Sequence, residues 1–373
     1  MSIRQMFPGS IVKPGFNPLA VQTPLYNLFA WGAGGNGKLG LGNTTSYNSP
    51  VQVGALTNWS IIDSSSNANN SVAIKTDGTL WGWGLNNYGQ LGLGNLTAYS
   101  SPKQIGALSA WSKLAVGNSF TLSIKTDGTL WSWGRNDYGQ LGYGGANRSS
   151  PVQVGALTNW LQISAGYYHS AAIKTDGTIW SWGDGTYGQL GLGNTTGYNS
   201  PKQIGALTNW SAISCGTLFN VAVKTDGTIW SWGYNVSGRL GIGNTTNYSS
   251  PKQIGALTNW SQPYSGDSAS TSIKTDGTLW SWGYNGNGTV GDGTIINRSS
   301  PVQIGSSTTW TSCSGGNDCA YGISAGQLYA WGSNGSGQLG LGNGTNYSSP
   351  KQVGSSNTWI LISAGQSTAH GIG

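Results

Sequence analysis

The sequence predicts an all-β protein: a seven-bladed β-propeller of four-stranded blades over residues 23–373, preceded by an extended arm over residues 1–22. Three observations support this prediction. A unit of about 50 residues recurs seven times, the composition disfavours helices, and each end of the chain holds half of a unit. Repeats of this length are typical of propellers and solenoids, in which each unit buries its apolar face against its neighbours.

The composition is typical of a β-rich, turn-rich domain. Of 373 residues, 62 are Gly, only 8% are charged, and all eleven acidic residues are Asp. A chain without Glu and rich in Gly, Asn, Ser and Thr forms helices poorly. Aromatic residues make up 11% and recur at fixed places, which excludes a disordered chain. We expect no transmembrane segment and no signal peptide, because the long apolar run that either would need is absent.

Every one of the 19 tryptophans belongs to the repeat. Seven begin a Trp-Gly pair, seven stand near the start of a unit, and five lie two residues before the Trp-Gly pair. Residues two apart in a strand share one face, so Trp131 and Trp133 point the same way. We expect these rings to form the core between neighbouring blades. The Trp-Gly series is Trp31, Trp83, Trp133, Trp182, Trp232, Trp282 and Trp331.

Four short strands are expected in each unit. In the unit that begins at residue 159 we assign them to "NWLQISAG", "HSAAIKTDGTIWSWG", "YGQLGLGN" and "SPKQIGAL". The Lys-Thr-Asp-Gly stretch is a turn joining two inner strands, because Asp-Gly between β-prone runs is a strong hairpin signal. The chain opens with the second half of a unit and ends with the first half of one. Pairing of these two half-units closes the ring at seven blades.

The unit "IKTDGTLWSWGRNDYGQLGYG" and its copies resemble the repeats of the regulator of chromosome condensation family, which form seven-bladed propellers. The resemblance covers residues from about 23 to 373. It implies the fold, but it does not select a function, because the family has several. Its nucleotide-exchange members use a protruding wedge, whereas no unit here departs from the 50-residue repeat by more than two residues. Its ultraviolet photoreceptors use Trp-Arg motifs that this chain lacks. Its chromatin-binding members use a basic tail, whereas residues 1–22 offer only Arg4 and Lys13.

Residues that could perform catalysis do not group together in the sequence. There are two histidines and three cysteines, with no Ser-His-Asp arrangement, no metal-ligand spacing and no phosphate-binding loop. Other units carry Phe120, Phe219 or Ala269 where one unit carries His169, so this histidine is expected to pack in the core. We therefore expect a protein that is not an enzyme, with no catalytic residues, no cofactor and no metal. Nucleic-acid binding is also unexpected, because the lysines are spread one or two per unit.

Two rings of variable residues are candidates for binding. The first lies three residues before each loop proline, in polar loops, and combines Tyr and Arg, which are common in protein interfaces. Packing against the neighbouring loop is the alternative. The second ring follows each Trp-Gly pair and contains Ala33, Leu85, Arg135, Asp184, Tyr234, Tyr284 and Ser333. The first ring, our candidate interface, is Tyr47, Tyr99, Arg148, Tyr198, Tyr248, Arg298 and Tyr347.

The arm contains three prolines and carries five apolar side chains outside any repeat: Met6, Phe7, Ile11, Val12 and Phe16. We expect these five to anchor the chain to a partner protein. Near-identical repeats with such an arm also resemble propellers encoded by bacteriophages. The main functional hypothesis is a virion-associated decoration, tail or host-attachment protein, which binds other virion subunits through the arm and has a host surface receptor or glycan as a further partner. The alternative is an intracellular protein-interaction scaffold or regulator of the chromosome-condensation type, with a cytoplasmic location. Membrane insertion is not expected in either case.

Overall fold

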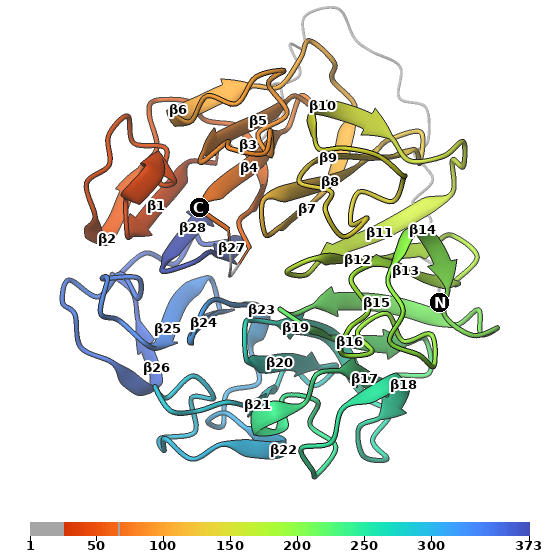
Figure 1. Ribbon diagram of the computed structural model, residues 1–373. Helices are drawn as coiled ribbons and strands as arrows, with labels where there is room; N and C mark the ends of the chain where they lie inside the picture. The colour runs from red at the N-terminus through yellow and green to blue at the C-terminus, as the bar shows by residue number, and fades with distance from the viewer. Residues whose placement is uncertain (1–25, 66–67) are drawn as a thin grey trace, which may run out of the picture.

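The computed structural model describes residues 26–65 and 68–373, which form seven four-stranded antiparallel sheets arranged in a ring. Figure 1 shows the sheets set around a central axis, with the chain passing from blade to blade in sequence order. The only helical elements among the described residues are two short 3-10 helices, η1 (Gly35–Gly37) and η2 (Val236–Gly238). The predicted all-β, seven-bladed propeller is confirmed.

Six blades are continuous in sequence, and in each the first strand lies innermost and the fourth outermost. Blade 1 holds β3 (Trp59–Asp63), β4 (Asn70–Lys75), β5 (Leu80–Gly84) and β6 (Tyr99–Gln104). Blade 2 holds β7 (Trp111–Gly117), β8 (Phe120–Lys125), β9 (Leu130–Gly134) and β10 (Arg148–Gln153). Blade 3 holds β11 (Trp160–Ala165), β12 (His169–Lys174), β13 (Ile179–Gly183) and β14 (Tyr198–Gln203).

The later blades repeat this order. Blade 4 holds β15 (Trp210–Cys215), β16 (Phe219–Lys224), β17 (Ile229–Gly233) and β18 (Tyr248–Gln253). Blade 5 holds β19 (Trp260–Ser265), β20 (Ala269–Lys274), β21 (Leu279–Gly283) and β22 (Arg298–Gln303). Blade 6 holds β23 (Trp310–Gly315), β24 (Cys319–Ser324), β25 (Gln327–Gly332) and β26 (Tyr347–Gln352).

Blade 7 joins the two ends of the described chain. It consists of β27 (Leu361–Ala364), β28 (Thr368–Ile372), β1 (Leu28–Gly32) and β2 (Tyr47–Gln52). Strands β1 and β28 pair in antiparallel register from Leu28 opposite Ile372 to Gly32 opposite Thr368. Asn27 and Gly373 exchange two backbone hydrogen bonds of 3.1 Å where other blades have a turn. The predicted closure by two half-units is confirmed.

Successive strands are antiparallel, so their connections alternate between the two faces of the ring. We call one face the loop face: it carries the turn after the first strand and the long loop after the third. The opposite face, the turn face, carries the Lys-Thr-Asp-Gly turns and the connections to the next blade.

One strand assignment was wrong. The segment "YGQLGLGN", residues 187–194, forms consecutive turns in the long loop, whereas residues 169–183 contain two strands. Gly188, Gly191 and Gly193 adopt φ angles of 77°, 70° and 80°, which a regular strand does not allow.

The Trp-Gly tryptophans form the contacts between blades. All seven are fully buried, as predicted. Each indole N–H donates to a backbone carbonyl of the preceding blade; Trp133, for example, donates to Gln90 O at 2.9 Å. Gly92 packs directly on this indole, because a Cβ there would lie 2.8 Å from Trp133 Nε1. Buried hydrogen-bonded aromatic rings combine a large apolar contact with a fixed orientation, which positions each blade against the next.

Candidate interaction surface on the loop face

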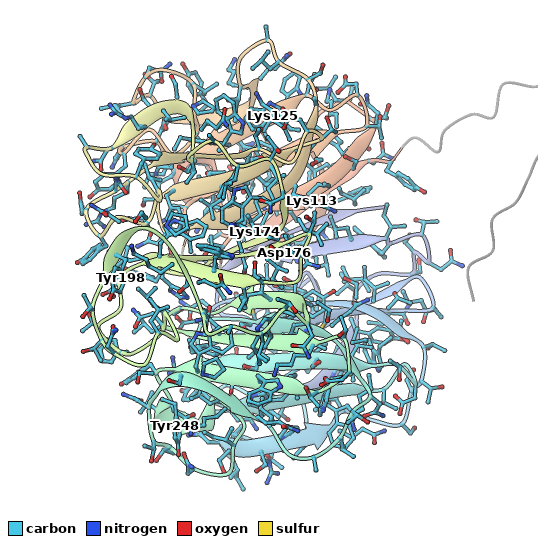
Figure 2. All side chains as sticks on the ribbon, turned by 90° about the vertical axis from the view of Figure 1, so that its right-hand side faces the viewer. Lys113, Lys125, Lys174, Asp176, Tyr198 and Tyr248 are labelled. Atoms are coloured by element: carbon cyan, nitrogen blue, oxygen red, sulfur yellow. The ribbon has the colours of Figure 1, made fainter. Side chains whose placement is uncertain are left out.

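The ring of Tyr and Arg residues expected to bind lies at the start of each outermost strand. The tyrosines are half-buried, and four of their hydroxyls accept hydrogen bonds from asparagines four residues earlier, such as Asn244 Nδ2 to Tyr248 at 3.4 Å; the four are Tyr47, Tyr99, Tyr248 and Tyr347. Lys252 also lies over the Tyr248 ring at 5.3 Å. Tyr198 and Tyr248 lie toward the same side of the molecule in the edge-on view of Figure 2, one blade apart. The structure spaces these residues around the rim and does not bring all seven together.

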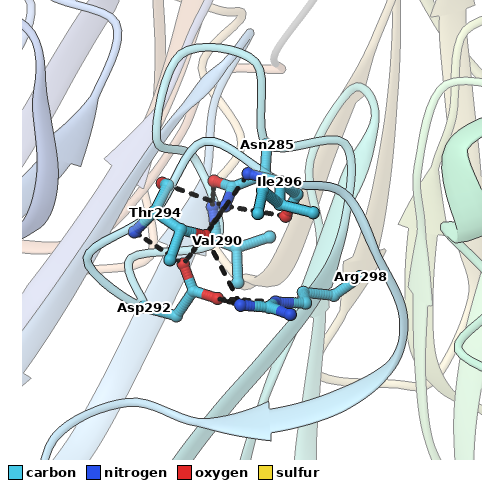
Figure 3. Close-up of polar contacts among 6 residues, drawn as sticks. All are labelled: Asn285, Val290, Asp292, Thr294, Ile296 and Arg298. Carbon is cyan, nitrogen blue, oxygen red and sulfur yellow. Dashed lines mark hydrogen bonds and ion pairs between the residues drawn. The ribbon is translucent and has the colours of Figure 1, made fainter.

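Arg298 shows how local this packing is. Its Nε lies 2.6 Å from Asp292 Oδ2, and that carboxylate also accepts from Thr294 Oγ1 at 2.7 Å. Figure 3 shows the pair within the loop, where Asn285 donates to the carbonyls of Thr294 and Ile296 at 3.1 and 3.0 Å. The hydrogen bonds from Thr294 and Arg298 hold the pKa of Asp292 below its ordinary value, although burial opposes them. Arg298 therefore orders its own loop, whereas Arg148 is exposed.

A denser cluster surrounds Arg135, a member of the second variable ring. Its guanidinium carbon lies 4.9 Å from the centre of the Tyr88 ring and 4.8 Å from that of Tyr168. Its Nε lies 2.6 Å from Asp137 Oδ2, and its Nη1 donates to the Tyr168 hydroxyl at 2.9 Å. Tyr138 stacks on Tyr168, with ring centres 4.4 Å apart and ring planes inclined by 18°. Arg135 thus links residues of three consecutive blades.

The Arg135 cluster also presents aromatic surface to solvent. Tyr138 is 45% exposed. Tyr167 adds a third ring, because it meets Tyr168 edge to face at 4.3 Å. An exposed ring that is already held by a stacked neighbour and a cation loses little freedom on binding. We define this loop-face surface as Tyr88, Arg135, Tyr138, Tyr167 and Tyr168.

Sequence reasoning included Arg135 but missed these four tyrosines. One signal was present: three consecutive units carry Tyr immediately before Gly-Gln-Leu-Gly, at Tyr88, Tyr138 and Tyr187. Tyr187 continues the series onto a second contact, because its ring lies 4.7 Å from that of Tyr234. Arg239 lies 5.0 Å from the Tyr234 ring. Burial is the largest influence on Arg239 and lowers its pKa, while Asp267, Tyr234 and Asp318 oppose that shift.

The central channel has one carboxyl group among the described residues that line it. A cavity of about 260 Å³ is lined by the innermost strands, and Asp63 faces it. Asp63 Oδ2 accepts from the backbone N–H of Val116 at 2.7 Å, and Oδ1 accepts from Ser363 Oγ at 3.1 Å. Burial raises the pKa of Asp63 to about 6, against the effect of these hydrogen bonds. A single carboxyl group without a partnering base does not make a catalytic pair.

The histidines and cysteines are buried among structural contacts. His169 is fully buried, and its Nε2 lies 3.0 Å from Asn220 Oδ1. Burial lowers the pKa of His169 to about 4, and lowers that of His370 to about 3. Burial raises the pKa of each cysteine thiol to about 12, which disfavours the reactive thiolate. Within residues 26–65 and 68–373, no three His, Cys or Asp side chains are grouped to hold a metal ion.

The arm residues Met6, Phe7, Ile11, Val12 and Phe16 lie outside the described residues, so their role stays a prediction. No helix in the described part of the chain is long and apolar enough to cross a membrane.

Comparison with known families identifies the repeat. A model described as the regulator of chromosome condensation (RCC1) repeat matches residues 27–74, 77–124, 127–173, 176–223, 226–273, 276–322 and 325–369. The chain belongs to the RCC1 repeat family. A second RCC1 repeat model matches residues 61–90, 111–140, 160–189 and 210–239. Each of the seven matches of the first model starts at the third strand of one blade and ends in the second strand of the next. RCC1 repeats and blades are therefore offset by half a unit.

Curated RCC1 relatives match over part of the chain. The probable E3 ubiquitin-protein ligase HERC6 of Homo sapiens is 35% identical over 102 residues, which are 26% of this chain and 10% of that ligase. The human E3 ubiquitin-protein ligase HERC2 is 36% identical over 81 residues, 22% of this chain and 2% of that ligase. The matched regions thus span at most a tenth of these relatives' length.

Two solved structures match over nearly the whole chain. Prp20p from Saccharomyces cerevisiae has a TM-score of 0.84 at 21% identity and covers 94% of this chain and 92% of its own. Human WBSCR16 has a TM-score of 0.83 at 19% identity, and the match covers 93% of this chain and 98% of the WBSCR16 chain. At these identities the likeness shows the shared propeller fold.

Proposed function

We propose that the chain is a non-enzymatic protein-interaction scaffold or regulator that binds a partner protein through the loop-face surface. The observation that carries this proposal is the Arg135 cluster, in which variable residues of neighbouring blades are held together on a repeated frame. Tyr and Arg contribute strongly to protein interfaces because each offers a large contact area and a polar tip. Side chains that are ordered before binding lower its entropic cost.

The comparisons support protein partners as a class. One solved structure shows yeast RCC1 (Prp20) bound to Kap60, and the description of another names binding of Prp20p to Gsp1p and histones. Those partners belong to the yeast protein. We carry over to this chain only the use of an RCC1 propeller as a protein-binding surface.

The alternative hypothesis drawn from the sequence is thus the better supported one. The family match and the solved structures support an interaction or regulator type of propeller, and none of the relatives described above supports a virion-associated role. We propose a cytoplasmic location as part of the same scaffold hypothesis. The arm is proposed as an additional anchor, supported by its apolar residues and prolines.

The absence of enzymatic activity is also a proposal. Its support lies in the buried neutral histidines, the high pKa values of the buried thiols and the lack of a base beside Asp63.

The test compares three full-length variants. Affinity purification from the native source, followed by binding measurements with the purified partner, uses wild type, the double variant Tyr88→Ala/Tyr168→Ala and the control Tyr347→Ala. Tyr347 starts the outermost strand of blade 6, away from the Arg135 cluster. We expect the double variant to bind the partner about tenfold or more weakly, and the control to bind normally. Unchanged affinity of the double variant would show that the partner uses another surface.

A further inference from the structure

A groove on the outer side of the Arg135 cluster has a composition of its own. It has a volume of about 490 Å³ and lies between the long loop of blade 2 and the start of the outermost strand of blade 3. Its ten lining residues are only tyrosine, asparagine, aspartate and glycine. The side chains that matter for binding are Tyr138, Tyr143 and Tyr198, with Asp137 and Asn199.

The groove arises from departures from the repeat in blade 2 and blade 3. The blade 2 loop, "GYGGANRSSP", is shorter than its equivalents and carries Tyr143 where other units have Leu41, Leu93 or Leu192. Gly145 in this loop adopts φ 119°, a conformation that side chains disfavour. Across the groove, Gly197 stands where other units have Ser, Ala or Asn. These departures shape the space between this pair of blades.

The shape of the short loop is fixed by buried hydrogen bonds. Asn136 Nδ2 donates to the carbonyls of Tyr143 and Gly145 at 3.0 and 2.9 Å. The equivalent Asn86 donates to carbonyls nine and eleven residues later, those of Asn95 and Thr97. Because Asn136 is only 6% exposed and fully engaged, the wall of the groove is held before any ligand arrives.

We propose that this groove binds a neutral saccharide. One face of a pyranose ring presents C–H groups that pack against an aromatic ring, and Tyr138 offers such a face with its 45% exposure. The edges of a sugar carry hydroxyls that both donate and accept, which suits the exposed amide of Asn199 and the carboxylate of Asp137.

The same composition disfavours other ligands. An apolar peptide would need aliphatic side chains in the groove, and none of the described residues that line it is aliphatic. A nucleic acid would need cationic groups, but the described lining residues include no Lys or Arg, and Asp137 is already paired with Arg135. Arg148 lies at the edge, its Nη2 3.9 Å from the position of a Cβ on Gly145. The lining itself thus presents no unpaired charge to a ligand, and the exposed cation of Arg148 borders it without lining it.

The test uses methyl glycosides of glucose, galactose, mannose and N-acetylglucosamine as probes, each followed by saturation-transfer NMR on the full-length protein. Two variants replace groove residues by the residue that other blades carry: Tyr198→Arg, as in Arg298, and Asn199→Ser, as in Ser249. Their matched controls are Tyr248→Arg and Asn48→Ser, at equivalent places in other blades.

We expect at least one glycoside to bind the wild type and both controls, and to bind Tyr198→Arg and Asn199→Ser about tenfold or more weakly. Binding that survives in both groove variants would place the sugar elsewhere and overturn the proposal. The absence of signal for all four glycosides at millimolar concentration would overturn it as well. The groove and the loop-face surface share Tyr138, but none of these variants changes Tyr88, Tyr138 or Tyr168, so the failure of one test is distinguishable from the failure of the other.

Discussion

The hydroxyl oxygen of Ser363 accepts a hydrogen bond of 2.9 Å from the backbone N–H of Ser64, across the closure of the ring. The innermost strands are sheet edges, and their inner N–H groups have no neighbouring strand. A side chain from the preceding blade takes that role. The same contact, from a backbone N–H to a side-chain oxygen of the preceding blade, recurs in four further places. The N–H donors and their acceptors are Cys215 to Ser164 at 2.9 Å, Ser265 to Ser214 at 2.9 Å, Ala364 to Ser314 at 3.0 Å, and Val116 to Asp63 at 2.7 Å.

These contacts predict that Ser214→Ala destabilises the ring. The substitution leaves the N–H of Ser265 without its acceptor, which costs about 1–2 kcal/mol when the group is half-buried. Blade 2 offers the reverse experiment, because Ala115 stands at the equivalent place. We expect Ala115→Ser to raise the free energy of unfolding by about 0.5–1 kcal/mol. Urea unfolding measures both, and a Ser214→Ala variant as stable as wild type would show that channel water replaces the contact.

The Trp-Gly tryptophans predict a large cavity effect. Trp182 is fully buried and donates to Gln140 O at 2.9 Å. Trp182→Ala should lower the free energy of unfolding by about 3–5 kcal/mol. The control is Trp180→Ala, two residues earlier, where the ring is half-buried and lies under Lys174 Nζ at 3.7 Å. We expect a clearly smaller loss there. Equal losses in thermal unfolding would contradict the assignment of Trp182 to the contact between blades.

From the burial of His169 we predict that the free energy of unfolding falls at acidic pH. Its pKa is lowered by burial to about 4, below the ordinary value of 6.5, so the folded protein resists protonation of this ring. The contribution of neutral His169 to the free energy of unfolding is complete above pH 6.5 and is lost as the pH falls toward 4. His169→Phe, which introduces the residue found at Phe120 and Phe219, should reduce the loss of stability over this range. His370 behaves in the same way, so part of the slope will persist. If the free energy of unfolding of His169→Phe depends on pH as steeply as that of wild type, His169 is not a source of the acid effect.

Much of the fold could be predicted because single residues at regular spacing indicate it. The Trp-Gly pairs give the number of blades, and the half-units at each end give the closure. The segment 187–194 was misassigned because its leucines alternate as in a strand, while glycines with positive φ turn the backbone at Gly188, Gly191 and Gly193.

The candidate site was harder to predict. Tyr138 and Tyr168 are 30 residues apart and meet only because a third-strand loop and a first-strand turn of neighbouring blades share one face. The ring from Tyr47 to Tyr347 was visible in the sequence, but its members start the outermost strands of seven different blades and so lie around the rim. Periodicity thus locates equivalent residues, whereas contacts between non-equivalent residues require the three-dimensional arrangement.

Asp63 predicts a pH effect of the opposite sign to that of the histidines. Burial raises its pKa from 3.8 to about 6, so the folded state holds the proton to higher pH than the unfolded state does. The free energy of unfolding therefore falls as the pH rises from about 4 to about 6, and the carboxylate is a cost above that range. A shift of two pKa units corresponds to about 3 kcal/mol, and partial contact with the channel reduces this to about 1–2 kcal/mol.

The substitution Asp63→Ser places at this position the residue found at Ser164, Ser214, Ser314 and Ser363, which can still accept from Val116 N–H. We expect the variant to be more stable than wild type above pH 7 by about 1–2 kcal/mol and to approach wild type below pH 4. Urea unfolding across this pH range measures both ends of the curve. A variant that is less stable than wild type at pH 8 would mean that the ionised carboxylate holds blades 1, 2 and 7 together more strongly than its burial opposes them.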